Sequence, residues 1–149
     1  MAGKTHIERS FRIYFDDGVT ARDLTASLIP GSVSGGGKVL DEVDMTAVSD
    51  AMKSYLAGHA DSEISAQFHL DDTATTGAFT VLMGMEGTGG TLTLQWGLAG
   101  AAPTTGDPEW EGEYVLLQAD CAINSGKAVI NARWRPQAGQ TAPAWGTVA

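Results

Sequence analysis

The chain has 149 residues, of which eighteen are acidic and nine are basic, so its formal net charge is −9. Proteins that bind nucleic acid through its phosphates need clusters of Lys and Arg, and the acidic balance therefore argues against that function. A chain of this length predicts one domain with its own hydrophobic core. The single cysteine, Cys121, argues against an intrachain disulfide or a thiolate metal site.

The N-terminal sequence has no apolar stretch typical of a secretory signal, and no apolar run approaches the roughly 18 residues that span a membrane. We therefore expect a protein that folds in a reducing cytoplasm and has no membrane partner. Residues 1–9 are mostly polar and predict an N-terminal arm.

Alternating apolar and polar residues, the pattern of a half-buried strand, recur along the chain. Turn signals at residues 16–18 (DDG) and 124–126 (NSG) predict hairpins between the first two and the last two of these strands. Cys121 falls on the apolar face of one strand, where a thiol packs as a small hydrophobe, so we expect it in the core. The predicted strands are residues 11–15, 24–28, 64–70, 91–96, 114–123 and 129–135.

Residues 29–44 predict a long loop, because they contain a Pro-Gly pair, two serines and three successive glycines at 35–37. Such a loop is either a mobile surface segment or a segment that becomes ordered against a neighbouring subunit. The residues that follow carry apolar side chains at helical spacing and predict an amphipathic helix over 47–56. Asp44 or Thr46 would cap its start, and Gly58 would end it. The apolar stripe consists of Val48, Ala51, Met52, Tyr55 and Leu56.

The remaining segments complete a mainly β domain. Residues 77–87 combine a helical spacing with two β-branched residues, and we interpret them as a short second helix. Residues 136–149 predict a C-terminal tail in which Trp145 docks on the same subunit or on the next one. The whole chain, residues 1–149, therefore predicts a single antiparallel β-sandwich or partly closed β-barrel with one flanking helix and a short second one.

No group of residues has the spacing of a catalytic or metal site. His69 lies next to Asp71 and Asp72, but no second histidine stands at a metal-binding spacing from it. The serines of residues 31–35 (GSVSG) lie in the predicted loop instead of on a strand-to-helix elbow. We predict a protein that is not an enzyme and binds no cofactor.

Residues 43–70 resemble the signature segment of the tail tube proteins of siphophages. In that family an Asp-Val-Thr step and a short helix are followed by a Tyr-Leu-x-Gly-x-x-Asp step and a Ser-x-Ser-type strand that ends in an aromatic residue and acids. This chain has Met45 where the family more usually has the valine. The order of the downstream elements is similar as well. The matching motif residues in this chain are Asp44, Thr46, Tyr55, Leu56, Gly58 and Asp61, followed by Phe68, Asp71 and Asp72.

The resemblance implies a structural virion protein that forms hexameric rings, stacked into the tube through which DNA passes during genome ejection. It implies that the loop over 29–44 bridges stacked rings. It also implies an acidic lumen that DNA crosses without specific binding. Candidate loop residues are Ile29, Pro30, Val33, Lys38, Val39, Leu40 and Glu42, and candidate lumen acids are Glu63, Glu111, Glu113 and Asp120.

The resemblance also implies partners and a location. Besides copies of itself, the partners would be the tail tip or initiator protein, the tape measure protein and the tail terminator protein. The protein would be made in the cytoplasm of the host bacterium and would reside in the tail of the virion.

Two other functions fit the same residues. A related tube or ring protein, such as a secretion-tube subunit or a head–tail joining protein, would share the fold. A monomeric ligand-binding β-sandwich would bind a glycan through Trp96, Trp110 and Trp134.

Overall fold

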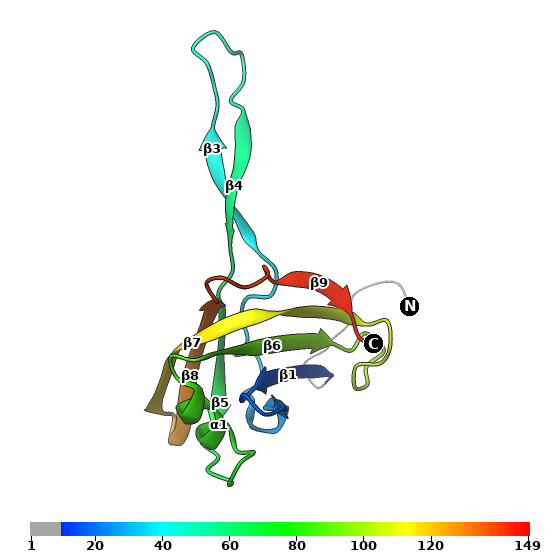
Figure 1. Ribbon diagram of the computed structural model, residues 1–149, viewed down its shortest axis with the longest axis vertical. Helices are drawn as coiled ribbons and strands as arrows, with labels where there is room; N and C mark the ends of the chain where they lie inside the picture. The colour runs from blue at the N-terminus through cyan, green and yellow to red at the C-terminus, as the bar shows by residue number, and fades with distance from the viewer. Residues whose placement is uncertain (1–9) are drawn as a thin grey trace.

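The computed structural model describes residues 10–149, and the predicted N-terminal arm, residues 1–9, lies outside them. The described residues form a seven-stranded antiparallel sheet, a two-stranded hairpin that projects from it, one α-helix and one short 3-10 helix (Figure 1). In chain order the elements are β1 (Phe11–Asp16), β2 (Ala21–Asp23), η1 (Thr25–Ser27), β3 (Val39–Asp44), β4 (Tyr55–Asp61), β5 (Ile64–His69), α1 (Ala78–Met85), β6 (Gly89–Trp96), β7 (Pro108–Asn124), β8 (Lys127–Pro136) and β9 (Ala144–Thr147).

The large sheet has the strand order β2-β1-β6-β7-β8-β5, and β9 also pairs with β7. Strand β7 has 17 residues, so it pairs with β6 along one edge and with β9 and then β8 along the other. Ser125 and Gly126 both have positive φ, as a two-residue turn between antiparallel strands requires. The predicted hairpin at this turn is therefore confirmed.

The segment that contains η1, residues 24–34, bridges the two sides of the curved sheet. At one edge the Leu24 amide donates to the Ile13 carbonyl at 3.0 Å. At the other edge Ser34 forms an isolated antiparallel bridge with Ser65 of β5. The result is a mainly β, partly closed architecture with one flanking helix, which confirms the predicted fold class.

The core lies on the inner face of this sheet, under α1. The inward side chains of β1, β5, β6, β7 and β8 form one buried cluster with the apolar side of the helix. Trp134 is fully buried at its centre, and its ring contacts those of Phe15 and Phe68 edge-on at 5.6 and 6.3 Å between centroids. No helix among residues 10–149 is long and apolar enough to cross a membrane.

The helix α1 confirms the short helix predicted over 77–87, and it offers a matched pair of substitutions. Leu82 is fully buried in the core, whereas a Cβ added at Gly84 would meet nothing within 4 Å. We expect Leu82→Ala to lower the free energy of unfolding by about 2–5 kcal/mol. We expect Gly84→Ala to raise it by about 1 kcal/mol, since alanine is the better helix former. Urea denaturation of both variants measures the two changes, and equal effects would contradict this placement of α1.

The helix predicted over 47–56 is wrong. Tyr55 and Leu56 belong to strand β4, where they pair with Asp44 and Val43 of β3. A helix of ten residues is marginal in water unless its apolar stripe packs on a core. This stripe lies in the projecting hairpin, and Val48 is fully exposed there. Cross-strand pairing therefore replaces the helix.

Two further expectations need correction. Residues 24–28 hold η1 instead of a second strand, and the shorter strand β2 pairs with β1 before it. Cys121 is exposed, although the alternation of β7 predicted a core position. A β-bulge between Leu116 and Gln118 moves the buried positions of β7 from Leu116 to Ala119, so Cys121 keeps the side of Ala119. It is exposed because the end of β7, residues 120–124, extends past the core.

Candidate assembly surfaces

The most exposed element is the hairpin of β3 and β4, residues 39–61, which we call the arm. It projects from one end of the molecule, away from α1 (Figure 1). Every residue of its two strands is exposed except Gly58, which is half-buried. Eight of the fourteen exposed large hydrophobic side chains of the described residues lie on the arm. They are Val39, Leu40, Val43, Met45, Val48, Met52, Tyr55 and Leu56.

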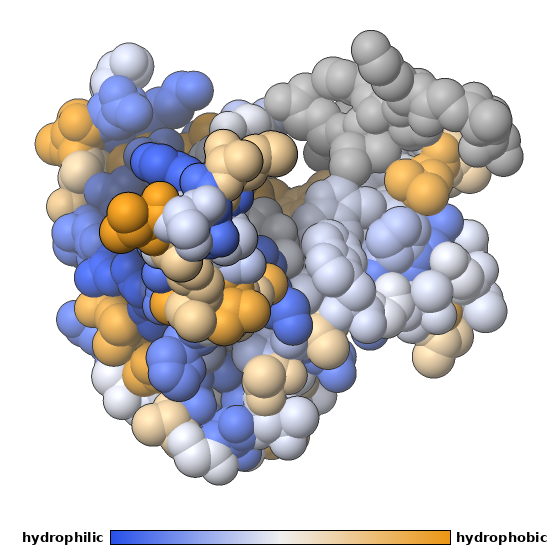
Figure 2. Space-filling model, turned by 90° about the horizontal axis from the view of Figure 1, so that it is seen from above, coloured by the Kyte–Doolittle hydropathy of each residue, from blue (hydrophilic) through white to orange (hydrophobic). Residues whose placement is uncertain are grey.

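A β-bulge gives the arm two different faces. The register shifts between Leu40 and Glu42, so Leu40 and Val43 point to the same side although they are three residues apart. Their cross-strand partners are Ala60 and Leu56, and one face is therefore apolar. Viewed from above, hydrophobic patches lie among hydrophilic ones at this end of the molecule (Figure 2). The opposite face is mixed and carries Val39, Glu42, Asp44, Tyr55, Ala57, His59 and Asp61.

The tip of the arm, residues 45–54, is closed by polar side chains. The Asp44 carboxylate accepts a hydrogen bond from the Thr46 amide at 2.9 Å, and the hydrogen bonds from Thr46 hold the pKa of that carboxyl below its usual value. The Thr46 hydroxyl accepts one from the Ser54 amide at 2.9 Å. Asp50 accepts one from the Ala47 amide at 2.7 Å. Asp44 and Thr46 therefore cap a hairpin end instead of a helix.

The other motif residues lie in β4. Tyr55, Leu56 and Asp61 pair across the hairpin, and Gly58 lets β3 approach. A Cβ at Gly58 would lie 3.0 Å from Cβ of Asp41, so glycine serves close packing there and does not end a helix.

The predicted loop over 29–44 divides into three parts. Ile29 to Ser34 run along the edge of β5, where the Ile29 amide donates to the Gln67 carbonyl at 2.9 Å, and Val33 packs against the core. Pro30, within this stretch, is exposed. Residues 35–37 form a tight glycine turn, and Lys38 leads into β3, which contains Val39, Leu40 and Glu42. The part of the chain that projects is thus 39–61.

The arm is joined to the body by a buried network, which we call the root. The Ser62 hydroxyl contacts the Gly37 carbonyl at 3.0 Å and the Tyr114 hydroxyl at 2.7 Å. The Trp110 indole donates to the same Tyr114 hydroxyl at 2.8 Å. Burial is the main cause that raises the pKa of Tyr114. Both ends of the arm therefore meet at one hydroxyl group that is bonded to β7.

The glycine turn of the root packs tightly against the body. Gly35 has φ +100°, and a Cβ there would lie 2.2 Å from the Glu63 carbonyl oxygen. A Cβ at Gly36 would lie 3.1 Å from the Trp96 ring, and one at Gly37 would lie 3.5 Å from Trp145. The predicted docking of Trp145 is within the same subunit, since its ring also contacts that of Trp96 at 5.3 Å between centroids.

Arg135 spans the outside of the root. Its guanidinium lies 2.5 Å from the Asp61 carboxylate and 2.6 Å from that of Glu63, and these partners raise its pKa. Asp61 and Glu63 flank Ser62, whose buried hydroxyl is hydrogen-bonded to Tyr114. Residue-by-residue reasoning missed Ser62 and Arg135 because their contacts join residues 25 to 74 positions apart. The only local signal at the root was the run of three glycines.

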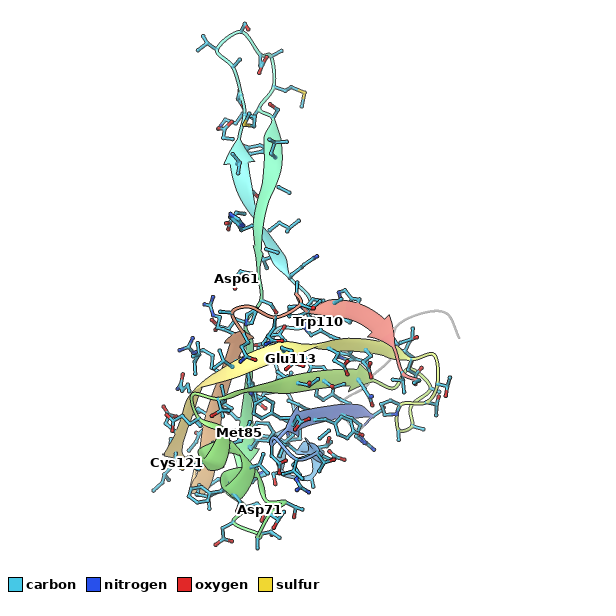
Figure 3. All side chains as sticks on the ribbon, viewed as in Figure 1. Asp61, Asp71, Met85, Trp110, Glu113 and Cys121 are labelled. Atoms are coloured by element: carbon cyan, nitrogen blue, oxygen red, sulfur yellow. The ribbon has the colours of Figure 1, made fainter. Side chains whose placement is uncertain are left out.

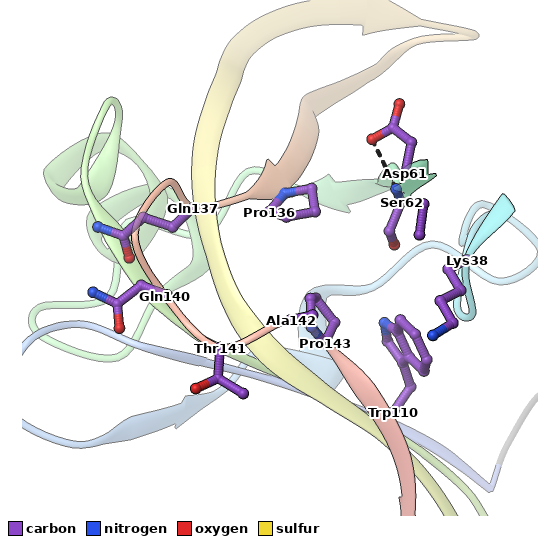
Figure 4. Close-up of a pocket in the computed structure, with 11 residues that line it drawn as sticks. Lys38, Asp61, Ser62, Trp110, Pro136, Gln137, Gln140, Thr141, Ala142 and Pro143 are labelled. Atoms are coloured by element: carbon purple, nitrogen blue, oxygen red, sulfur yellow. Dashed lines mark hydrogen bonds between the residues drawn. The ribbon is translucent and has the colours of Figure 1, made fainter. Parts of the chain in front are cut away.

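A cavity of about 210 Å³ opens beside the root (Figure 4). Lys38 and Asp61 line its arm side, and Trp110 forms part of its body side. The remaining wall comes from the segment between β8 and β9, which contributes Gln140 and Pro143.

The outer face of the large sheet, opposite the core, carries a row of carboxylates. Thr91, Thr93 and Gln95 of β6 donate hydrogen bonds of 2.5–3.0 Å to Glu113, Glu111 and Glu109 of β7. Trp110 stands between Glu109 and Glu111 in the sequence, but its side chain points into the core and is 1% exposed. These hydrogen bonds hold the carboxylates in a fixed row along β7.

The candidate lumen acids share this outer face but differ in their neighbours. Glu111 and Glu113 belong to the row on β7. Asp120 lies farther along the same strand, beyond the bulge, and accepts a hydrogen bond from Asn131 at 3.0 Å. Glu63 lies apart from them at the root, where Arg135 neutralises it.

The three tryptophans of the glycan-binding alternative, Trp96, Trp110 and Trp134, do not form an exposed platform. Trp110 and Trp134 are 1% and 0% exposed, so neither can stack on a ligand. Trp96 is half-buried between Phe11 and Trp145, with ring centroids 5.5 and 5.3 Å away. No cluster of three or more His, Cys, Asp or Glu side chains with metal-binding geometry occurs in residues 10–149.

The curved sheet, the flanking helix and the projecting hairpin define a tail-tube-like fold. A chain from the tail of an empty gene transfer agent particle, refined with C6 symmetry, matches with a TM-score of 0.62 at 16% identity, over 97% of this chain and 100% of that one. A chain of the anti-feeding prophage baseplate matches with 0.68 at 10% identity, over 98% and 97%.

A third solved structure has a similar fold. A chain from the sheath–tube complex of an extracellular contractile injection system, in its extended state, matches with a TM-score of 0.62 at 11% identity, over 97% of this chain and 93% of that one. No protein-family model and no curated protein matches the sequence. At these low sequence identities the structural similarity establishes the fold. A shared fold does not by itself establish a shared function.

Proposed function

We propose that this protein is a structural, non-enzymatic subunit of a phage tail tube. Copies associate into hexameric rings, and the rings stack into a tube of the siphophage type that conducts DNA during genome ejection. The protein is made in the host cytoplasm and resides in the virion tail. Its partners are other copies of itself, the tail tip or initiator protein, the tape measure protein and the tail terminator protein.

The exposed apolar face of the arm is the observation that carries this proposal. A two-stranded hairpin without a supporting layer is marginally stable in water. The arm nevertheless presents Leu40, Val43 and Leu56 together on one side, and each of these side chains stays exposed among residues 10–149. Exposed apolar patches of this kind mark interaction sites. We assign this face to the contact with a subunit of the adjacent ring.

Ring formation follows from the exposed surfaces and backbone edges of the subunit. Contacts between different surfaces of identical subunits close into rings when the rotation permits it. Open strand edges are paired by neighbours in such rings instead of remaining exposed.

Shortening the arm tests the proposal. Leu40 and Ala60 face each other across the hairpin, so an Asn-Gly turn can join them in place of residues 41–59. The removed residues make no contact with the core, and we expect the body to unfold at an unchanged denaturant concentration. We expect tube formation, followed by sedimentation and negative-stain microscopy, to be lost. Tubes of normal length from the shortened protein would refute the role of the arm.

The carboxylate row on β7 is our candidate for the lumen surface. Fixed negative charges repel DNA phosphates, so DNA would pass without binding. Replacing Glu111 and Glu113 by lysine reverses two charges of the row in each subunit, twelve per ring of six. We expect the variant tubes to retain DNA at low salt and release it as salt rises, and parent tubes to retain none. Equal retention by both tubes would place the row outside the lumen.

A tube of a contractile injection system is the second candidate function. It is favoured by the match to the anti-feeding prophage chain, which has the highest TM-score of the three comparisons above, 0.68. Electron micrographs of whole particles separate the two: a bare tube supports the siphophage type, and a tube inside a contractile sheath supports the second candidate.

A further inference from the structure

We propose that the root is a rigid socket, in which the Ser62 hydroxyl and the Arg135 guanidinium are positioning residues that hold the arm in one direction before assembly. The inference rests on the proposed function, because an arm with a fixed direction matters only if it meets another subunit. It adds a role for two residues that neither contact the apolar face of the arm nor belong to the tail-tube motif.

The inner half of the socket is the buried Ser62 side chain. Ser62 follows β4 directly, and its hydroxyl reaches the Gly37 carbonyl just before β3, so it ties the two ends of the arm together. The same hydroxyl is bonded to Tyr114, which is 0% exposed and is held by the Trp110 indole. A single side chain therefore fixes the arm to the middle of the large sheet.

The outer half is Arg135. It contacts Asp61 at 2.5 Å and Glu63 at 2.6 Å, one residue on each side of Ser62. Ion pairs as exposed as these add little to the free energy of unfolding. Two simultaneous contacts from one planar guanidinium do, however, define an orientation. Ser62 fixes the position of the arm on the body, and Arg135 fixes the rotation of the arm about that point.

The surroundings show which movement the socket prevents. On one side the Gly36 and Gly37 backbone is already against Trp96 and Trp145, so the arm cannot tilt that way. On the other side lies the cavity of about 210 Å³ between Lys38, Asp61 and the segment between β8 and β9 (Figure 4). The arm has room to tilt into this cavity once the two contacts are lost. A binding element that is already oriented loses less entropy on association.

Distance measurements between two spin labels test the socket. Cys121 is exposed at the end of the molecule away from the arm (Figure 3), and Val48→Cys supplies a second label at the tip. We expect the labelled monomer to give one narrow distance distribution by pulsed electron resonance. Adding Ser62→Ala or Arg135→Gln should at least double its width, while the melting temperature of Arg135→Gln stays within about 2 °C of the parent.

Arg133→Gln is the matched control. Arg133 lies on the same strand and reaches Glu63 only at 3.9 Å, without contacting Asp61. Its distribution should keep the parent width. A broad distribution in the parent, or parent-like widths in both root variants, would overturn the socket. Because the measurement uses dilute monomer, a narrow parent distribution together with a failure to form tubes would reject the proposed function and leave the socket standing.

Discussion

Replacing Val43 by aspartate should stop tube growth while the subunit stays folded. Val43 is 43% exposed in the free subunit and pairs with Leu56 on the apolar face of the arm. Docking on a second subunit removes the remaining surface of both side chains from water, which contributes about 1–3 kcal/mol. An aspartate there loses this contribution and must also be desolvated, which costs about 2 kcal/mol or more.

The sum of about 3 kcal/mol or more corresponds to a rise of roughly 100-fold or more in the protein concentration needed for assembly. Light scattering against protein concentration measures that threshold. His59→Asp is the matched control, because it places the same carboxylate on the opposite face of the arm, on strand β4. We expect a small shift from the control. Equal shifts from both substitutions would show that the apolar face is not the docking face.

Gly35→Ala should be among the most destabilising substitutions in the chain. Its φ of +100° is a conformation that side chains avoid, at a cost of about 1–2 kcal/mol. The new Cβ would also lie 2.2 Å from the Glu63 carbonyl oxygen, so the backbone of the root has to move. We expect a total loss of about 3 kcal/mol or more in the free energy of unfolding, and a melting temperature lower by roughly 6–12 °C.

Gly18→Ala is the control that separates the cost of the positive φ from the cost of the steric clash with Glu63. Gly18 has φ +91°, close to that of Gly35, but a Cβ there meets nothing within 4 Å. Its substitution should cost only the conformational term of about 1–2 kcal/mol. If both variants melt at the same temperature, the close packing of the root is absent in solution.

Sequence patterns predicted the elements whose structure is decided locally. The alternation at residues 64–70 and 129–135 became β5 and β8, and the NSG turn became the hairpin between β7 and β8. Glu109, Glu111 and Glu113 alternate along the sequence, but the β6 side chains that hold them in a row depend on pairing between strands.

Long-range pairing decided the rest. The apolar stripe at 47–56 has a helical period, but pairing of β4 with β3 overrides it. The bulge after Leu40 decides which arm residues share a face, and the bulge after Leu116 moves the buried positions of β7 from Leu116 to Ala119. A bulge depends on the partner strand, so neither can be found by counting residues along one segment. The root could not be predicted from the sequence for the same reason, because the hydrogen bond between Ser62 and Tyr114 joins residues 52 positions apart.

Electron cryo-microscopy of assembled protein tests the central claim most directly. We expect stacked sixfold rings in which the Leu40, Val43 and Leu56 face of each arm is buried against a subunit of the next ring, with the β7 carboxylates facing the lumen. Single rings that do not stack, or tubes in which this face of the arm remains in solvent, would contradict it.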